Sequence, residues 1–135
     1  MGYRLVREIF IFLTGGFAYC ILEVIFRGRS HISMLLAGGM AFYLIGHIYE
    51  RNKDNVSVPI IMLAGMMVIT LLEFIIGMVV NIYLKLGVWD YSKLPLNIKG
   101  QICPVFSACW FAASFIIIKL FPVIQGWIIS KTSID

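Results

Sequence analysis

Charged side chains are scarce in this sequence. Only 13% of its 135 residues are Asp, Glu, Lys or Arg, whereas 61% are hydrophobic, and the mean hydropathy is +0.95. A water-soluble domain of this length could not bury so much apolar surface, because small domains keep a large surface-to-volume ratio. The composition therefore excludes an ordinary soluble domain and predicts one compact integral membrane domain, residues 1–135.

Metal-binding patterns are also missing. The three cysteines lie in or beside apolar runs without a CxxC, and the two histidines, His31 and His47, do not form an HxxxH pair. We therefore expect no metal site, no cofactor and no disulfide framework. The net charge of +4 is scattered among hydrophobic segments, so the expected partners are membrane lipids with anionic headgroups rather than nucleic acid.

Four long apolar runs are present instead. About 20 residues cross a hydrocarbon core, and a helix satisfies its own backbone hydrogen bonds in lipid. The runs predict helices at about 9–26, 32–49, 57–84 and 102–121. The stretch 122–135 either extends the fourth helix with a kink at Pro122 or lies in the interface with Trp127 as anchor. The expected fold is an all-α polytopic membrane protein with four transmembrane helices in two hairpins.

Basic residues hardly favour either orientation, because six fall on one side of the predicted helices and five on the other. The first side holds Arg4, Arg7, Arg51, Lys53, Lys119 and Lys131, and the second holds Arg27, Arg29, Lys85, Lys93 and Lys99. Orientation is then either set by another feature, or the chain inserts both ways and pairs as an inverted dimer.

A weak internal repeat relates the two halves. "GGFAYCILE" at 15–23 is similar to "GMMVITLLE" at 65–73, and each places Gly eight residues before Glu. The two helical hairpins would then be divergent copies, and repeats of this kind often build transport sites at their interface. The competing interpretation is chance similarity in apolar sequence of low diversity.

Two carboxylates lie inside predicted helices, where a charge costs roughly 2.5 to 3.5 kcal/mol. Glu23 lies four residues before Arg27, so the two can pair on one helix face and neutralise each other. Glu73 is either a protonated carboxyl group hydrogen-bonded between helices or a carboxylate that responds to protons or cations. It belongs to a stripe that we expect to face the bundle interior or a wet cavity. The stripe consists of Thr70, Glu73, Gly77, Asn81 and Lys85.

Small residues mark a second surface, on the helix predicted at 32–49. Gly38, Gly39 and Gly46 lie there with Ala37 and Ala41. Membrane helices use such surfaces to approach one another closely. We expect this surface to make a helix contact rather than to line a channel.

The connector 86–101 is not built like a plain hydrophilic loop. Apolar and polar residues alternate in it, Pro95 discourages a continuous helix, and Trp89 and Tyr91 suit the headgroup region. We expect an interfacial or re-entrant segment. Asn97 would cap a fourth helix that begins near Ile98, with the Gly100 carbonyl left free by Pro104. If that helix begins near Cys103, Pro104 simply occupies its first turn.

The connector also carries a family resemblance. "WDYS" followed by "PLNIKGQI" and "FSACW", after a helix with "LEFIIG", resembles the small bacterial membrane proteins called putative ABC-transporter type IV, or CmpB-like. The resemblance implies a membrane protein of transporter type and brings no defined biochemical role. The matched positions are Glu73, Gly77, Trp89, Asp90, Tyr91, Ser92, Asn97, Gly100 and Trp110.

Together these features predict a small transport or channel-type protein of the cell membrane, with a polar intramembrane site around Glu73 covered by the connector. Four helices leave little room for a pathway, so we expect a homo-oligomer that handles a small solute or a lipid. The candidate ligand- or ion-binding residues are Glu23, Arg27, Glu73, Asn81, Trp89, Asp90, Tyr91, Ser92, Asn97 and Gln101.

Two other hypotheses stay open. The chain could be a noncatalytic lipid-binding or accessory subunit of a larger membrane complex. It could also be an intramembrane lipid-modifying enzyme with Asp90 and Glu73 as acid or base, which we do not favour because no nucleophile–base pair is evident. No GxxxxGK[ST] phosphate loop occurs, so an ATP-driven system would need an ATPase from another chain.

Overall fold

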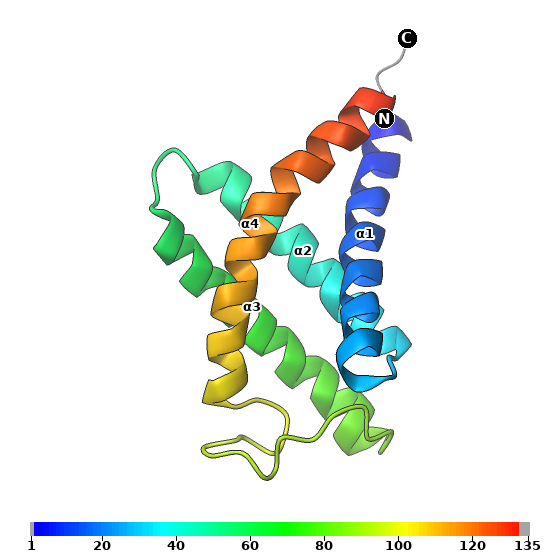
Figure 1. The fold of residues 1–135 in the computed structure, drawn as a ribbon, viewed down its shortest axis with the longest axis vertical. Coiled ribbons are helices and arrows are strands. Elements are labelled where there is room, and N and C mark those ends of the chain that lie inside the picture. Colours follow the sequence, from blue (N-terminus) through cyan, green and yellow to red (C-terminus); the bar gives the residue numbers. More distant parts are fainter. Residues whose placement is uncertain (1, 133–135) are drawn as a thin grey trace.

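Four long helices form the part of the chain that the computed structural model describes, residues 2–132 (Figure 1). They are α1 (Gly2–Arg27), α2 (Ile32–Asn52), α3 (Val58–Gly77), which a π-helical segment η1 (Met78–Tyr83) continues, and α4 (Pro104–Thr132). No strand occurs within these residues. Each of the four spans, with η1 counted in the third, is long and apolar enough to cross a membrane. The predicted all-α, multi-pass membrane fold is therefore confirmed.

Three of the helices extend beyond the apolar runs that predicted them, and α2 does so by three residues, to Asn52. α1 begins at Gly2 instead of residue 9, because the polar sequence around Arg4 and Arg7 continues the same helix. α4 passes through Pro122 and ends at Thr132, so residues 122–132 extend the fourth helix and do not form a separate interfacial segment. The last three residues of the predicted tail lie outside the described residues. Lys119 consequently lies inside α4, where its ammonium group is 5.4 Å from the centre of the Phe115 ring.

Helices α1 and α2 pack closely through facing glycines. A Cβ added at Gly38 would lie 2.5 Å from the Cβ of Tyr19, and one added at Gly15 would lie 2.3 Å from the Cβ of Phe42. Real Cβ atoms do not approach so closely, so only glycine permits this spacing. Gly46 in turn accommodates the Phe121 ring of α4. The expectation that the small residues of α2 make helix contacts is confirmed.

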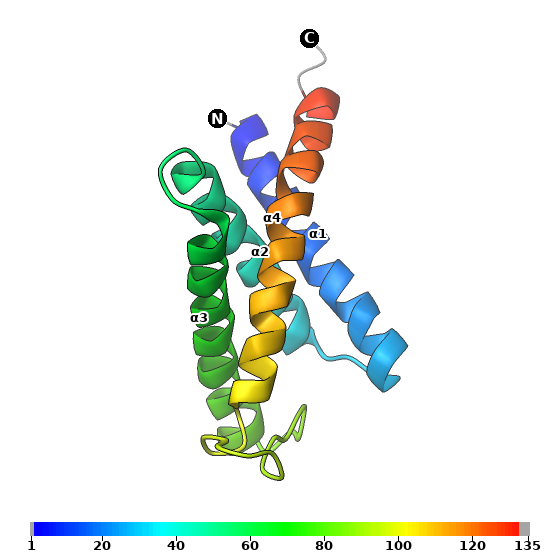
Figure 2. The same cartoon turned by 60° about the vertical axis from the view of Figure 1, so that its left-hand side comes forward.

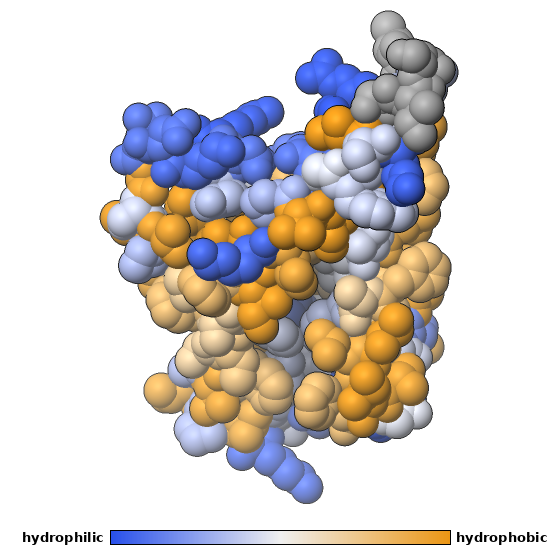
Figure 3. All heavy atoms as spheres, turned by 45° about the horizontal axis from the view of Figure 1, so that its top comes forward, coloured by the Kyte–Doolittle hydropathy of each residue, from blue (hydrophilic) through white to orange (hydrophobic). Residues whose placement is uncertain are grey.

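Most of the outer surface is apolar. Phe26 and Val123, for example, expose 82% and 67% of their surface. Figure 3 shows hydrophobic residues over most of the visible face, with hydrophilic residues gathered toward its ends. A soluble monomer rarely exposes so continuous an apolar surface, whereas a protein surrounded by lipid requires it.

The connector between η1 and α4 folds against one end of the bundle (Figures 1 and 2). Trp89 is only 6% exposed, and it packs with Met34 of α2 and Val80 of η1. Lys85 and Gly87 have φ values of 54° and 60°, a left-handed conformation that turns the chain back at the end of the π-helical segment. The connector is therefore a packed part of the fold and not a solvated loop.

The fourth helix begins at Pro104. This agrees with the alternative in which the helix starts near Cys103 and Pro104 occupies its first turn. Asn97 therefore does not cap it, and that prediction is wrong. The Gly100 carbonyl is also not left free, because it accepts a hydrogen bond of 2.7 Å from the backbone N–H of Tyr91. Proline suits the first turn of a helix because its missing N–H would have no helical partner there.

Candidate functional site

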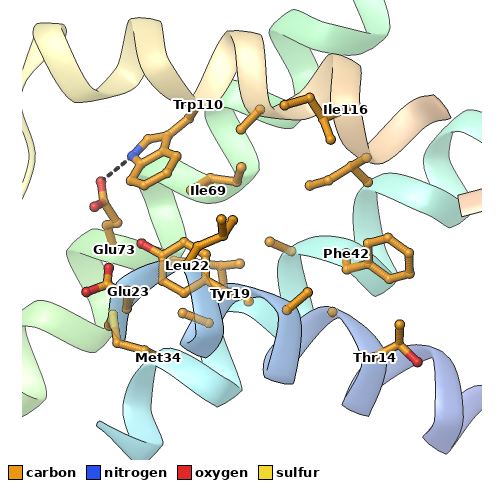
Figure 4. Close-up of a pocket in the computed structure, with 18 of the residues that line it drawn as sticks. Thr14, Tyr19, Leu22, Glu23, Met34, Phe42, Ile69, Glu73, Trp110 and Ile116 are labelled. Atoms are coloured by element: carbon orange, nitrogen blue, oxygen red, sulfur yellow. Dashed lines mark hydrogen bonds between the residues drawn. The ribbon is translucent and has the colours of Figure 1, made fainter. Parts of the chain in front are cut away.

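A cavity of about 200 Å³ lies among the four helices and beneath the connector (Figure 4). We call it the Glu73 cavity. Its charged groups gather at one end, and the rest of its wall is apolar except for Thr14 at the opposite end. The polar end contains Tyr19, Glu23, Arg27, Glu73 and Tyr91. The chamber is thus amphipathic, which is typical of sites for molecules that carry both a polar and an apolar part.

The apolar wall of the cavity extends to the outer surface of the bundle. Leu22 of α1 lines it, as do Ile116 and Leu120 of α4. These three side chains are 51%, 58% and 46% exposed. Because the outer surface is lipid-facing in character, this wall separates the cavity from lipid between α1 and α4.

Glu73 is the central polar group of the site. It is 8% exposed. Its Oε1 accepts a hydrogen bond of 2.7 Å from the Tyr91 hydroxyl, and its Oε2 accepts one of 2.8 Å from the indole Nε1–H of Trp110. An ionised carboxylate can only accept hydrogen bonds, so each oxygen has a matching donor. Burial, with the nearby Glu73 carboxylate, raises the pKa of Tyr91, which keeps its hydroxyl proton available for this bond.

Glu23 and Arg27 form the second charged pair of the cavity. Arg27 Nη1 lies 2.8 Å from Glu23 Oε2, one helical turn away on α1. Arg27 Nη2 also donates to the carbonyl of Val88 in the connector. The predicted pairing of Glu23 with Arg27 is confirmed. Glu73 makes no ion pair with any residue of the stretch 2–132.

The rest of the polar stripe fixes the connector to the bundle. Asn81 Nδ2 donates to Gln101 Oε1 over 2.7 Å, and Asn81 Oδ1 accepts the backbone N–H of Val88 over 2.7 Å. Trp89 Nε1 donates to the Gln101 carbonyl over 3.1 Å. Gly77 leaves room for this network, since an added Cβ would lie 2.4 Å from Gln101 Oε1. Asn81 and Gln101 therefore support the site from behind the cavity wall.

Farther along α3, the stripe again faces its neighbours inside the bundle. Thr70 Oγ1 lies 2.8 Å from Ser107 Oγ of α4. Lys85 lies beyond the helix, where the chain turns back. The expectation that the stripe faces the interior is confirmed from Thr70 to Asn81.

Five of the ten predicted site residues do not line the cavity; besides Asn81 and Gln101, these are Asp90, Ser92 and Asn97. Asp90 accepts the backbone N–H of Ser92 over 2.9 Å, and this hydrogen bond is the main cause of the lowered pKa of Asp90. Asn97 Nδ2 donates to the carbonyls of Ser92 and Leu94, and its Oδ1 accepts the N–H of Gly100 over 2.9 Å. Asp90, Ser92 and Asn97 thus shape the connector, and none of them lines the cavity.

Two aromatic residues of the site were absent from the predicted set. Trp110 and Tyr19 both line the cavity, and their ring centres are 6.2 Å apart. The signal for Trp110 was its place among the positions that match the family resemblance. Tyr19 gave no comparable signal, because it is one aromatic residue among many in an apolar run.

A second polar cluster, at the opposite end of the bundle, was also missed. His47 Nε2 lies 2.8 Å from Glu8 Oε2, although 39 positions separate the two residues. Arg7 lies beside Glu8, with 3.3 Å between Nη2 and Oε1. Among residues 2–132, no group of three or more His, Cys, Asp or Glu side chains could hold a metal ion.

Comparison with known proteins gives one result. No curated protein and no solved structure matches the chain. The family described as "Putative ABC-transporter type IV" matches residues 10–134, which include the connector and all the residues of the Glu73 cavity. With its four membrane-spanning helices and so extended a match, the chain belongs to the putative ABC-transporter type IV family.

Proposed function

We propose that this chain is a membrane-spanning transport subunit and that the Glu73 cavity is its solute site. The observation that carries the proposal is the burial of Glu73 at one end of a cavity among four apolar helices. Ionisable groups at membrane depth are costly, and they commonly mark substrate or ion pathways. The transporter-type description of the family supports the same function.

The contacts of Glu73 support binding rather than acid–base catalysis. Both of its oxygens are held by donors from other segments, Tyr91 and Trp110. Asp90, which an acid–base mechanism would need as a partner, lies outside the cavity lining. A carboxylate fixed in this way presents a steady negative charge to whatever enters the cavity.

In the same proposal, the protein works in the cell membrane as a homo-oligomer. The cavity wall reaches the surface at Leu22, Ile116 and Leu120, so a second copy packed between α1 and α4 would enclose a pathway. The nearly balanced basic residues are compatible with an inverted pair. If ATP drives transport, the ATPase comes from a separate chain.

A flux assay tests this function. Proteoliposomes containing the protein are given labelled cationic, neutral and anionic amphiphiles of similar size. Wild-type protein should take up at least one class, and Glu73→Gln should remove that uptake. Glu50→Gln is the matched control, because Glu50 lies near the end of α2 and pairs with Lys53 over 3.1 Å. If the Glu73→Gln variant took up the amphiphile as fast as the wild-type protein, the role of Glu73 in solute binding would be contradicted.

One observation favours a second candidate function, a lipid-binding accessory subunit. The lipid-facing wall between α1 and α4 would let an acyl chain enter the cavity from the side. Lipid that co-purifies with the protein, together with no uptake of any amphiphile class, would support this alternative over transport.

A further inference from the structure

We propose that the ligand of the Glu73 cavity is an organic ammonium ion, a monovalent alkylated amine with a compact apolar body. The inference takes the cavity as a ligand site, and to that extent it rests on the proposed function. It adds the chemical class of the ligand, which follows from charge, from the aromatic lining and from the few oxygen atoms available.

The charge of the cavity comes first. Its charged lining residues are Glu23, Arg27 and Glu73. Arg27 is committed to Glu23 at 2.8 Å and to the Val88 carbonyl, so Glu73 is left with two neutral donors and no cation. A buried carboxylate without a counter-ion is unfavourable. When Glu73 is ionised, no ion pair within residues 2–132 balances its charge. A monovalent cation in the cavity would balance that charge, whereas an anion would be repelled by it.

The aromatic lining points to the kind of cation. Four aromatic side chains meet the cavity near Glu73, namely Tyr19, Trp89, Tyr91 and Trp110. A cation within about 6 Å of an aromatic ring centre is attracted to the face of the ring, and tryptophan is the strongest partner. Figure 4 shows Trp110 and Tyr19 beside the two glutamates, so the rings and the charge occupy the same end of the cavity.

The polar edges of these rings are already used. Trp110 and Tyr91 donate to Glu73, and Trp89 donates to the Gln101 carbonyl. One face of Tyr91 is also covered, because its ring stacks on Phe106 with 4.4 Å between the ring centres. A ligand would therefore meet the ring surfaces that line the cavity. Rings that offer faces together with a carboxylate match an alkylated ammonium, which is bound through charge and ring contact and needs few hydrogen bonds.

A bare metal ion suits the cavity less well. Calcium takes about six to eight oxygen ligands, and magnesium needs close to six in octahedral geometry. In the described residues, the charged oxygens that line the cavity are those of Glu23 and Glu73. Glu23 Oε2 and both oxygens of Glu73 already accept hydrogen bonds from side chains of the protein. A hydrocarbon-covered cation avoids this shortage of ligands.

The remaining wall accepts an apolar body. Ala18, Ala37 and Ala41 leave space beside Ile69 and Leu72. A volume of about 200 Å³ limits that body to a compact group. The ammonium could belong to a free amine or to a lipid headgroup that enters between α1 and α4, and the experiment below separates these sources.

Binding is measured with the full chain in nanodiscs of phosphatidylglycerol, a lipid without an amine. The probe is benzyltrimethylammonium, and its uncharged carbon isostere, neopentylbenzene, is the comparison. Tryptophan fluorescence is recorded in a Trp127→Phe background, because Trp127 is 62% exposed and does not line the cavity. We expect a saturable change with the ammonium and at least tenfold weaker binding of the isostere. Equal affinity for both compounds would overturn the proposal.

Variants locate the site. Glu73→Gln should weaken ammonium binding at least tenfold, whereas Glu50→Gln should leave it unchanged. Tyr19→Phe keeps the ring and should retain affinity, whereas Tyr19→Leu should lower it severalfold. The Tyr19 pair keeps the test decisive if Glu73→Gln folds poorly. Wild-type affinity in both Glu73→Gln and Tyr19→Leu would also overturn the inference.

The lipid composition identifies the source of the ammonium. Weaker binding of the probe in phosphatidylcholine nanodiscs would mean that the lipid's own ammonium competes for the cavity. Unchanged binding would mean that the site takes a free amine, and either result supports an ammonium ligand. Ammonium binding without any flux would leave this inference standing and contradict transport. Glu73-dependent flux of a neutral solute, without ammonium binding, would support transport and overturn the ammonium inference.

Discussion

The indole of Trp110 on α4 donates a hydrogen bond of 2.8 Å to the carboxylate of Glu73 on α3. The two residues are 37 positions apart in the sequence. The bond couples the helices on either side of the connector, and Tyr91 of the connector completes the arrangement from the other oxygen. The two donors of the site therefore also hold its three segments in register.

Replacing the indole donor should destabilise the fold. Trp110→Phe leaves one oxygen of a buried carboxylate without its donor, and we expect a loss of about 1–3 kcal/mol. Thermal or chemical unfolding in detergent measures this loss. Trp127→Phe is the matched control, because Trp127 is 62% exposed, and its midpoint should barely change. Equal stability of the two variants would show that the bond contributes nothing.

The packing of α1 on α2 gives a second prediction. A methyl group at Gly38 would lie 2.5 Å from Tyr19 Cβ, so Gly38→Ala should cost about 1–3 kcal/mol through overpacking. At Gly126, inside α4, an added Cβ meets nothing within 4 Å. Gly126→Ala should instead leave stability unchanged or raise it by up to about 1 kcal/mol, because alanine favours the helix. Parallel unfolding of both variants tests the contrast in sign.

The attachment of the connector can be followed at one amide. Val88 donates its backbone N–H to the Asn81 side chain over 2.7 Å. Asn81→Ala should therefore speed hydrogen exchange of the Val88 amide by at least tenfold. Asn97→Ala serves as the control, because Asn97 accepts the N–H of Gly100 and not that of Val88. This variant should speed exchange of the Gly100 amide and leave the Val88 amide protected. Slow exchange at Val88 in Asn81→Ala would contradict this account of the connector.

Acid should loosen the turn at Asp90. The pKa of Asp90 is lowered, chiefly by the backbone N–H of Ser92 and then by the Ser92 side chain. A lowered folded pKa means that the stabilisation is fully present above the unfolded value of about 3.9. It is lost as the pH falls through the folded pKa. The amide shift of Ser92 should titrate with a midpoint below about 3.9, and Asp90→Asn should abolish that step. A midpoint above the unfolded value would refute the assigned cause.

Hydropathy was sufficient to predict the four membrane helices, and helical spacing predicted the interior face of α3 from Thr70 to Asn81. The ion pair between Glu23 and Arg27 could be predicted because the two residues are one helical turn apart. The hydrogen bond between Trp110 and Glu73 could not be predicted, since it depends on how α4 packs on α3. Asp90 and Asn97 were expected at the site, and their side chains form hydrogen bonds within the connector. In a sequence, polar residues that close a turn look like polar residues that bind a ligand. Glu8 was overlooked because its partner His47 lies on another helix.

Two arginines join the α1–α2 junction to the connector at one end of the bundle: Arg27 is the last residue of α1, and Arg29 lies in the chain that follows. Arg27 reaches the Val88 carbonyl, and Arg29 Nη2 lies 3.4 Å from that of Gly87. Toward the end that carries the two termini, α1 is held by apolar packing instead, because Ile11 of α1 and Ile128 of α4 are buried in one hydrophobic cluster with Phe121. α1 is thus fixed by side-chain hydrogen bonds at one end and by buried apolar contacts toward the other. Any movement of α1 away from the rest of the bundle has to break the arginine hydrogen bonds at one end or the buried cluster at the other.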